Sequence, residues 1–184
     1  MLEQLSRHIA TTIKKIDPDG PTSIEVMSYE LGIRLNYLAT IILTITMGLL
    51  TRDLWGSLFA LISFVLIRKL SGGFHMKSLT ACAIMSALIF STIPKIDLNT
   101  TWIFILTAIQ TIIYILHSPN HMIELNPSKS NPFLMKLLSV LVCLINLILQ
   151  SPILALTLMV QAILILPWKG VLNDDETKNS SEAV

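Results

Sequence analysis

The residues best suited to chemistry in this chain are a histidine and a cysteine, His75 and Cys82, which lie seven positions apart. Seven residues span about two turns of an α-helix. The thiolate form of cysteine is a strong nucleophile, and a neighbouring imidazole can take the proton from the thiol. The pair is therefore our candidate active site, with Cys82 as the nucleophile and His75 as the base.

The residues around this pair supply the flexibility and the helix start that such a site needs. Gly72 and Gly73 allow backbone conformations that are closed to other residues. If Ser78 caps a new helix, Cys82 lies in or just past its first turn. The open N–H groups and the helix dipole at that position favour a thiolate.

Each of these residues also has a simpler interpretation. His75 could be a solvated loop residue, and Cys82 could be a small buried hydrophobe. Arg68 is either a positive anchor at the membrane boundary or a group that steadies an anionic part of a substrate. The second cysteine, Cys143, lies in the middle of a long apolar run, and we expect it only to pack.

The composition predicts an integral membrane protein. The chain has 184 residues, of which 53% are hydrophobic and only 14% are charged, and a soluble domain of this size could not bury so much apolar surface. We expect a single all-α domain over residues 1–184, built as a bundle of membrane helices. The net charge of +1 gives no indication of a nucleic-acid partner. The N-terminus lacks the long apolar core of a cleaved signal peptide.

Residues 1–21 are predicted to form an amphipathic N-terminal segment. Apolar side chains recur at helical spacing through Ile16, with charged side chains on the other side of the helix. Such a helix is suited to lie on a membrane surface. Thr22 followed by Glu25 resembles a capping box that would start the next helix. We expect that helix to continue into the first apolar run.

The apolar runs predict about six membrane-embedded helices. They cover residues 35–50, 54–68, 79–93, 99–116, 133–149 and 153–167. Several are only about 15 residues long, which is short against the ~20 residues that usually span a bilayer. The connections after the first, third and fifth runs are short, which favours an up-and-down arrangement of neighbouring helices.

The placement of charge predicts the orientation. Of the 13 lysines and arginines, only Arg52 and Lys95 fall in the short turns on one side of the bundle. Because positive residues favour the cytoplasmic side, we expect a multi-pass protein of a bacterial cell membrane with both termini in the cytoplasm. His75 and Cys82 then face the cytosol at the membrane boundary. The polar tail, residues 170–184, is expected to be disordered.

Two other classes of function stay open on the residues alone. His117, His121 and Glu124 have the spacing of metal ligands on one face of a helix, although Pro119 disfavours a continuous helix through them. They would indicate a metal-dependent hydrolase. A non-enzymatic transport or export component is the other alternative, and charges within the membrane would favour it. The predicted spans carry almost no charges, and we predict neither a metal nor a cofactor.

The stretch Arg68-Lys69-x-x-Gly72-Gly73-x-His75, followed by Cys82, resembles the signature of the accessory gene regulator B (AgrB) family. Weaker similarities extend through most of the chain, at Leu31-Gly32, Ser118-Pro119, Gln161-Ala162 and Leu166-Pro167. Gln161 stands near a position at which family members often carry an acidic residue.

This resemblance implies a membrane cysteine endopeptidase that processes quorum-sensing peptide precursors. The partner would be a small amphipathic precursor peptide at the lipid bilayer, cleaved through an acyl-thioester on Cys82 and closed into a thiolactone or lactone ring. Arg68, Gly72, Gly73 and Ser78 would support the site or position the substrate. N–H groups between Ser78 and Cys82 would be natural donors to the oxyanion. A homodimer is compatible with the resemblance.

The predicted topology can be tested with a cysteine placed at Ser128, in the segment 117–132. Because we expect this segment in the cytoplasm, a membrane-impermeant thiol reagent should label Ser128→Cys only after the cells are opened. The unsubstituted protein provides the background for this comparison. Labelling of Ser128→Cys in intact cells would contradict the six-span scheme.

Overall fold

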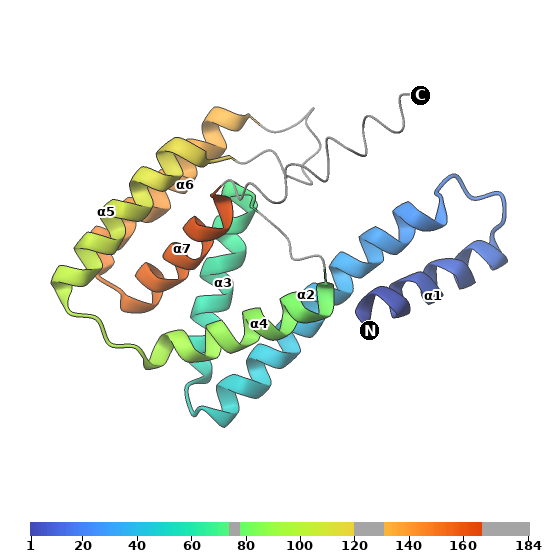
Figure 1. Cartoon of the computed structure of the whole chain (residues 1–184), viewed down its shortest axis with the longest axis horizontal. Helices are drawn as coiled ribbons and strands as arrows, with labels where there is room; N and C mark the ends of the chain where they lie inside the picture. Colours follow the sequence, from blue (N-terminus) through green and yellow to red (C-terminus); the bar gives the residue numbers. More distant parts are fainter. Residues whose placement is uncertain (74–77, 120–130, 167–184) are drawn as a thin grey trace.

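The structure is a computed structural model that describes residues 1–73, 78–119 and 131–166. Within these ranges the chain forms helices and no strand, so the predicted all-α fold is confirmed (Figure 1). In chain order the helices are α1 (Leu2–Ile16), α2 (Ile24–Leu50), α3 (Leu54–Ser71), α4 (Leu79–Thr92), the short 3₁₀ helix η1 (Ile93–Lys95), α5 (Thr100–His117), α6 (Pro132–Leu149) and α7 (Pro152–Ile165).

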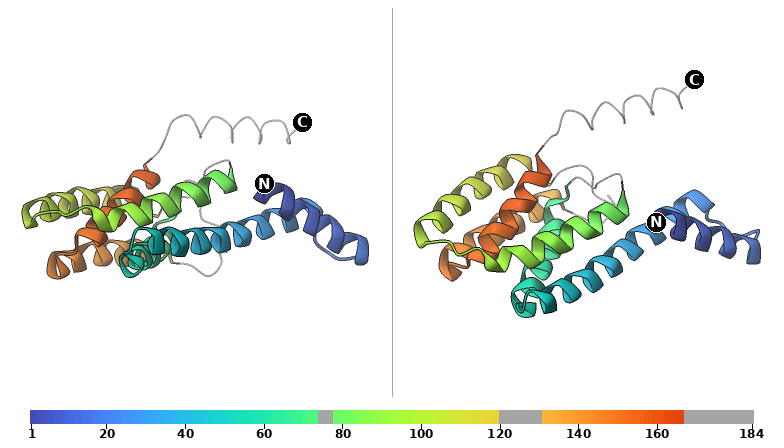
Figure 2. Two further views of the ribbon diagram at one scale, coloured as in Figure 1. Left: turned by 90° about the horizontal axis from the view of Figure 1, so that it is seen from below. Right: turned by 60° about the horizontal axis from the view of Figure 1, so that its bottom comes forward.

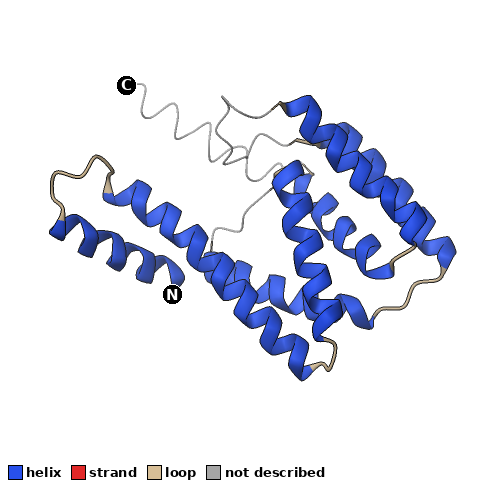
Figure 3. Cartoon of the chain, turned by 180° about the vertical axis from the view of Figure 1, so that it is seen from behind, coloured by secondary structure: helices blue, strands red, loops and turns tan. Residues whose placement is uncertain are grey.

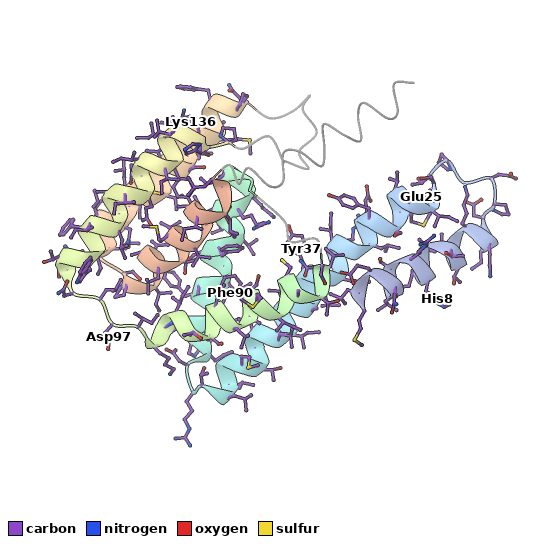
Figure 4. All side chains as sticks on the ribbon, viewed as in Figure 1. His8, Glu25, Tyr37, Phe90, Asp97 and Lys136 are labelled. Atoms are coloured by element: carbon purple, nitrogen blue, oxygen red, sulfur yellow. The ribbon has the colours of Figure 1, made fainter. Side chains whose placement is uncertain are left out.

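Helices α2 to α7 run alternately in opposite directions (Figures 1 and 3). The connections from α2 to α3, from η1 to α5 and from α6 to α7 lie at one end of the bundle, whereas α3, α5 and α7 end at the other. Figure 4 marks the two ends with Asp97, before α5, and Lys136, near the start of α6. The predicted up-and-down order is therefore confirmed, while the side of the membrane stays a prediction.

Side-chain caps determine where most of these helices start. Asp53, Asn99 and Ser151 each accept a hydrogen bond from a backbone N–H in the first turn of α3, α5 and α7, at 3.0, 3.0 and 3.3 Å. Ser23 caps α2 in the same way, at 3.3 Å. The predicted capping box at Thr22 is therefore wrong by one residue, because the hydroxyl that reaches the open N–H belongs to Ser23.

Six of the helices are apolar and lie at the positions of the six predicted spans. In the part of the chain that the structure describes, four of them, α2, α3, α5 and α6, are long and apolar enough to cross a membrane. Helices α4 and α7 are shorter, so six full spans are not confirmed. Large apolar side chains such as Ile42, Leu66, Ile112 and Ile148 are exposed on the outside of the bundle. A surface of this kind fits a lipid environment, and the chain is a membrane protein.

Helix α3 lies inside the bundle, where it packs against α2, α4, α6 and α7. One buried cluster, with Ile67 and Tyr114, joins α3 to α5, α6 and α7. A second joins α3 to α4 and α7 and contains Phe64 and Phe90, whose ring centroids are 5.0 Å apart. Cys143 is fully buried in the first cluster, so its predicted packing role is confirmed.

The N-terminal helix α1 folds back on the start of α2, and the two form a hairpin that projects from the bundle (Figure 2). Ser6 and Ala10 are the buried residues of α1. A Cβ added to Gly32 of α2 would lie 3.4 Å from the Ser6 Oγ, because small residues let the two helices approach closely. The apolar stripe of α1 stays accessible, with Leu5 47% and Ile13 41% exposed. This stripe is therefore available to a membrane or to a ligand.

The Glu3 carboxylate joins the first turn of α1 to the start of α4. One oxygen accepts a hydrogen bond from the Leu79 N–H at 2.6 Å and one from the Ser78 hydroxyl at 3.3 Å. The other oxygen accepts one from the Thr80 hydroxyl at 3.3 Å. Hydrogen bonds to the carboxylate, the largest from its own backbone N–H, lower the pKa of Glu3 from 4.5 to about 2. A negative charge at this position also interacts favourably with the dipole of α4.

Replacing Glu3 with Ala should loosen the first turn of α4, because the Leu79 N–H loses its acceptor. Hydrogen exchange of the full chain in detergent, followed by mass spectrometry, should be faster in the segment that starts at Leu79. Glu25→Ala is the matched control, since it removes an exposed acid in the first turn of α2. Equal exchange in Glu3→Ala and the unsubstituted protein would contradict the docking role.

The same contact predicts a dependence on pH. The pKa of Glu3 is lower in the folded chain than its usual value, so its contribution to stability is fully present above about 4.5 and is lost as the pH falls towards about 2. After correction for intrinsic exchange rates, protection of the first turn of α4 should persist from neutral pH to about 4.5 and weaken below it. Loss of protection near neutral pH would contradict this assignment.

Candidate active site

Cys82 lies where the sequence predicts, in the first turn of α4. The Ser78 Oγ accepts a hydrogen bond from the Ala81 N–H at 3.3 Å, and the Ser78 carbonyl oxygen accepts one from the Cys82 N–H at 3.0 Å. The prediction that Ser78 caps this helix is therefore confirmed. The Cys82 side chain is partly exposed, in contrast to the buried Cys143.

Cys82 lines a cavity of about 480 Å³ that is formed by α2, α3, α4 and α7. Most of its wall is apolar, with contributions from Ile41, Leu61, Phe64, Met85, Val160 and Leu164. Figure 4 labels two further lining residues, Tyr37 on α2 and Phe90 on α4. A cavity of this size and lining suits the apolar side chains of a ligand. The thiol of Cys82 is therefore placed beside a space that an apolar ligand can enter.

Arg68, near the end of α3, brings a fixed positive charge to the same cavity. The centre of its guanidinium group lies 5.5 Å from the centroid of the Phe64 ring, close enough for a cation–π interaction. Its Nη1 donates a hydrogen bond to the Gln161 Oε1 at 3.5 Å. Arg68 is therefore held by the protein at the wall of the cavity, and its action on a substrate stays a prediction.

Helix α3 ends in a turn that favours glycine. Gly72 and Gly73 have φ angles of 70° and 128°, which are strained for residues with a side chain. A Cβ added to Gly73 would also lie 3.0 Å from the Gln161 Nε2. The predicted conformational freedom at both glycines is therefore used, and the turn leads directly into residues 74–77.

A buried amide on α7, the side chain of Gln161, holds this turn. Its Nε2 donates to the Ser71 Oγ at 3.1 Å and also to the Gly72 carbonyl oxygen, while its Oε1 accepts from Arg68. The side chain is fully buried. We did not predict this role from the sequence. The signal that could have indicated it is an amide within an otherwise apolar helix, since polar groups at membrane depth need partners inside the protein.

The backbone N–H groups at the start of α4 are less available than predicted. The Leu79 N–H donates to Glu3, the Ala81 N–H donates to the Ser78 Oγ, and the Cys82 N–H donates to the Ser78 carbonyl oxygen. Each of these three predicted oxyanion donors therefore already has a partner within the chain. Arg68 is a charged donor at the same cavity.

Several predicted residues lie outside the described residues. His75 belongs to the segment 74–77, so its pairing with Cys82 stays a prediction. His117 is the last residue of α5, but His121 and Glu124 of the metal-binding alternative fall in the segment 120–130. The tail over residues 170–184, predicted to be disordered, also lies outside the described ranges.

Comparison with known proteins identifies the same family that the sequence motif resembles. A family model described as Accessory gene regulator B matches residues 3–168. An AgrB-like protein of Halalkalibacterium halodurans is 31% identical to the chain over 109 residues, which cover 59% of this chain and 55% of that protein. The chain thus spans about half the length of the curated relative that it matches. No solved structure matches the chain.

Replacing Gln161 with Leu should destabilise the bundle by about 1–3 kcal/mol, because the Gly72 carbonyl oxygen and Arg68 each lose a buried partner. The matched control is Gln110→Leu. Gln110 is also fully buried, but neither amide atom of its side chain has a hydrogen-bond partner in the part of the chain that the structure describes. That substitution should be neutral or stabilising.

Thermal unfolding in detergent measures both variants. A lower unfolding temperature for Gln161→Leu than for Gln110→Leu is expected. Equal unfolding temperatures would show that the hydrogen bonds of Gln161 are not needed to hold the end of α3.

Proposed function

The chain belongs to the accessory gene regulator B family, and on this premise we propose that it is a membrane-embedded cysteine endopeptidase that processes a small precursor peptide for quorum sensing. The observation that carries the proposal is the position of Cys82. Its side chain is partly exposed at the start of α4 and lines an apolar cavity that also holds the positive charge of Arg68. A thiol, a cation and an apolar binding space are three of the parts that such a reaction needs.

In the first step, His75 takes the thiol proton and the Cys82 sulfur attacks the carbonyl carbon of the scissile peptide bond. The tetrahedral intermediate carries a negative charge on oxygen, which Arg68 can stabilise from the wall of the cavity. Collapse of the intermediate breaks the C–N bond, and His75 returns the proton to the leaving amine. The remainder of the peptide is then held as an acyl-thioester on Cys82.

In the second step, a side-chain thiol or hydroxyl of the bound peptide attacks the thioester carbonyl. This displaces the Cys82 sulfur, which regains its proton, and closes a thiolactone or lactone ring. Exchange of one thioester for another is nearly balanced in free energy. Removal of the cyclic product would therefore draw the reaction forward.

The substrate that fits these features is an amphipathic peptide at the cytoplasmic surface of a bacterial cell membrane. The accessible apolar stripe of α1 lies on the helix that Glu3 docks beside Ser78 and Leu79. A peptide held along this stripe would be kept near the start of α4. In this proposal, substrate binding and the nucleophile lie at the same membrane interface.

The chemical proposal is tested by expressing the protein together with the small peptide encoded by a neighbouring reading frame and following the peptide mass. Cys82→Ala and His75→Ala should each reduce cleavage by about a thousandfold or more, and the double variant should be little worse because the two groups act as one unit. Cys82→Ser should also be severely impaired, since a hydroxyl is harder to ionise than a thiol.

Cys143→Ala is the matched control, because this thiol is buried in the core and is not expected to react. It should keep its activity. Full cleavage by Cys82→Ala would overturn the thiol mechanism. Loss of activity with a chelator alone would favour the metal-dependent alternative, and export of the peptide without cleavage would favour a transport component.

A further inference from the structure

We propose that Asn36 on α2 positions the substrate by accepting a hydrogen bond from a backbone N–H of the bound peptide. The side chain is buried, with the residue only 5% exposed. Its Oδ1 has no hydrogen-bond partner among the described residues. Asn36 nevertheless lines the same cavity as Cys82. The inference rests on the function proposed above and names a group that makes direct contact with the substrate.

The packing of α2 on α4 brings Asn36 level with Cys82. A Cβ added to Gly32 would lie 2.8 Å from the Leu79 side chain, so these two positions are in contact. From that contact both helices run in the same general direction (Figures 1 and 2). Asn36 is one turn beyond Gly32 on the same face of α2, and Cys82 is about one turn beyond Leu79. The two side chains therefore open onto the cavity at similar depth.

The unsatisfied amide oxygen indicates the chemistry of the ligand. A buried acceptor without a donor costs free energy, about 1–3 kcal/mol in proteins, and such groups in native structures call for an explanation. The ligand must supply an N–H or O–H donor, while the mostly apolar wall of the cavity favours apolar groups. A peptide segment with apolar side chains has both, whereas the acyl chain of a lipid has no donor.

Neither of the next two polar residues on this face of α2, Thr40 and Thr44, both lines the cavity and has an unpartnered side chain among the described residues. Thr40 lines the cavity, but its hydroxyl already donates to the Asn36 carbonyl oxygen at 2.8 Å. The Thr44 hydroxyl is buried and has no partner among the described residues, but Thr44 is not a lining residue. Thr44 is therefore a matched control on the same face of the same helix.

The test uses the full chain in lipid vesicles and two alkylating probes. The first is a dipeptide chloromethyl ketone with two apolar side chains. The second is its analogue in which an ester oxygen replaces the backbone N–H nearest the ketone, so that this donor is lost. Mass spectrometry follows alkylation of the Cys82 sulfur, which displaces chloride from the probe. The proteins compared are the unsubstituted chain, Asn36→Leu and Thr44→Val.

The unsubstituted chain and Thr44→Val should react about tenfold faster with the amide probe than with the ester probe, the difference expected for one hydrogen bond. Asn36→Leu should react with both probes at equal rates. Its unfolding temperature should not fall, because leucine removes an unsatisfied buried group.

A preference for the amide probe that persists in Asn36→Leu would overturn the role of Asn36 and leave the Cys82 mechanism intact. Equal rates for both probes in the unsubstituted chain would also overturn it, and would fit a cavity that takes a lipid chain. If neither probe alkylates Cys82 faster than Cys143, the result would contradict the proposed function itself.

Discussion

The hydrogen bonds of the Gln161 side chain determine how the third helix ends beside the candidate site. Polar groups at membrane depth have no water to bond with, so they must find partners within the protein. The Gln161 Nε2 donates hydrogen bonds to the Ser71 hydroxyl and to the Gly72 carbonyl oxygen, and the Gln161 Oε1 accepts a hydrogen bond from Arg68. One residue of α7 therefore fixes both the glycine turn after α3 and the cation at the cavity wall. The segment that carries His75 begins directly after this turn.

The same requirement separates structural polar groups from those that indicate function. Gln161 has a partner for each half of its amide and is fully buried, so its role is to hold the fold. Asn36 is almost as buried, but its oxygen has no partner within the described ranges, and the residue lines the same cavity as Cys82. A neutral amide left without a partner is therefore informative only where a ligand has space to approach it. The side chain of Gln110 also has no partner in the described part of the chain, but it does not line the cavity of Cys82, so it carries no such meaning.

The helices could be predicted from the sequence because their causes are local. Apolar runs and capping residues such as Ser78 lie within a few residues of the helices that they define, and the predicted bounds of α3 to α7 agree with the structure to within three residues. The cavity, the docking of Glu3 at Leu79 and the contacts of Gln161 could not be predicted. The Glu3–Leu79 and Gln161–Arg68 hydrogen bonds join positions 76 and 93 residues apart in the chain, and the cavity is formed by four helices, α2, α3, α4 and α7. A helical pattern does not say which faces of two helices will meet.

The central claim is that the Cys82 sulfur carries the peptide during the reaction, and mass spectrometry of the rapidly quenched protein tests it most directly. The full chain in lipid vesicles is mixed with its precursor peptide, stopped in acid at short times and digested for mapping. We expect a transient adduct on Cys82 that has the mass of the precursor without its C-terminal part and that hydroxylamine removes, as it does a thioester. Cleaved peptide that accumulates while Cys82 remains unmodified at every time, or an adduct that maps to another residue, would contradict the claim.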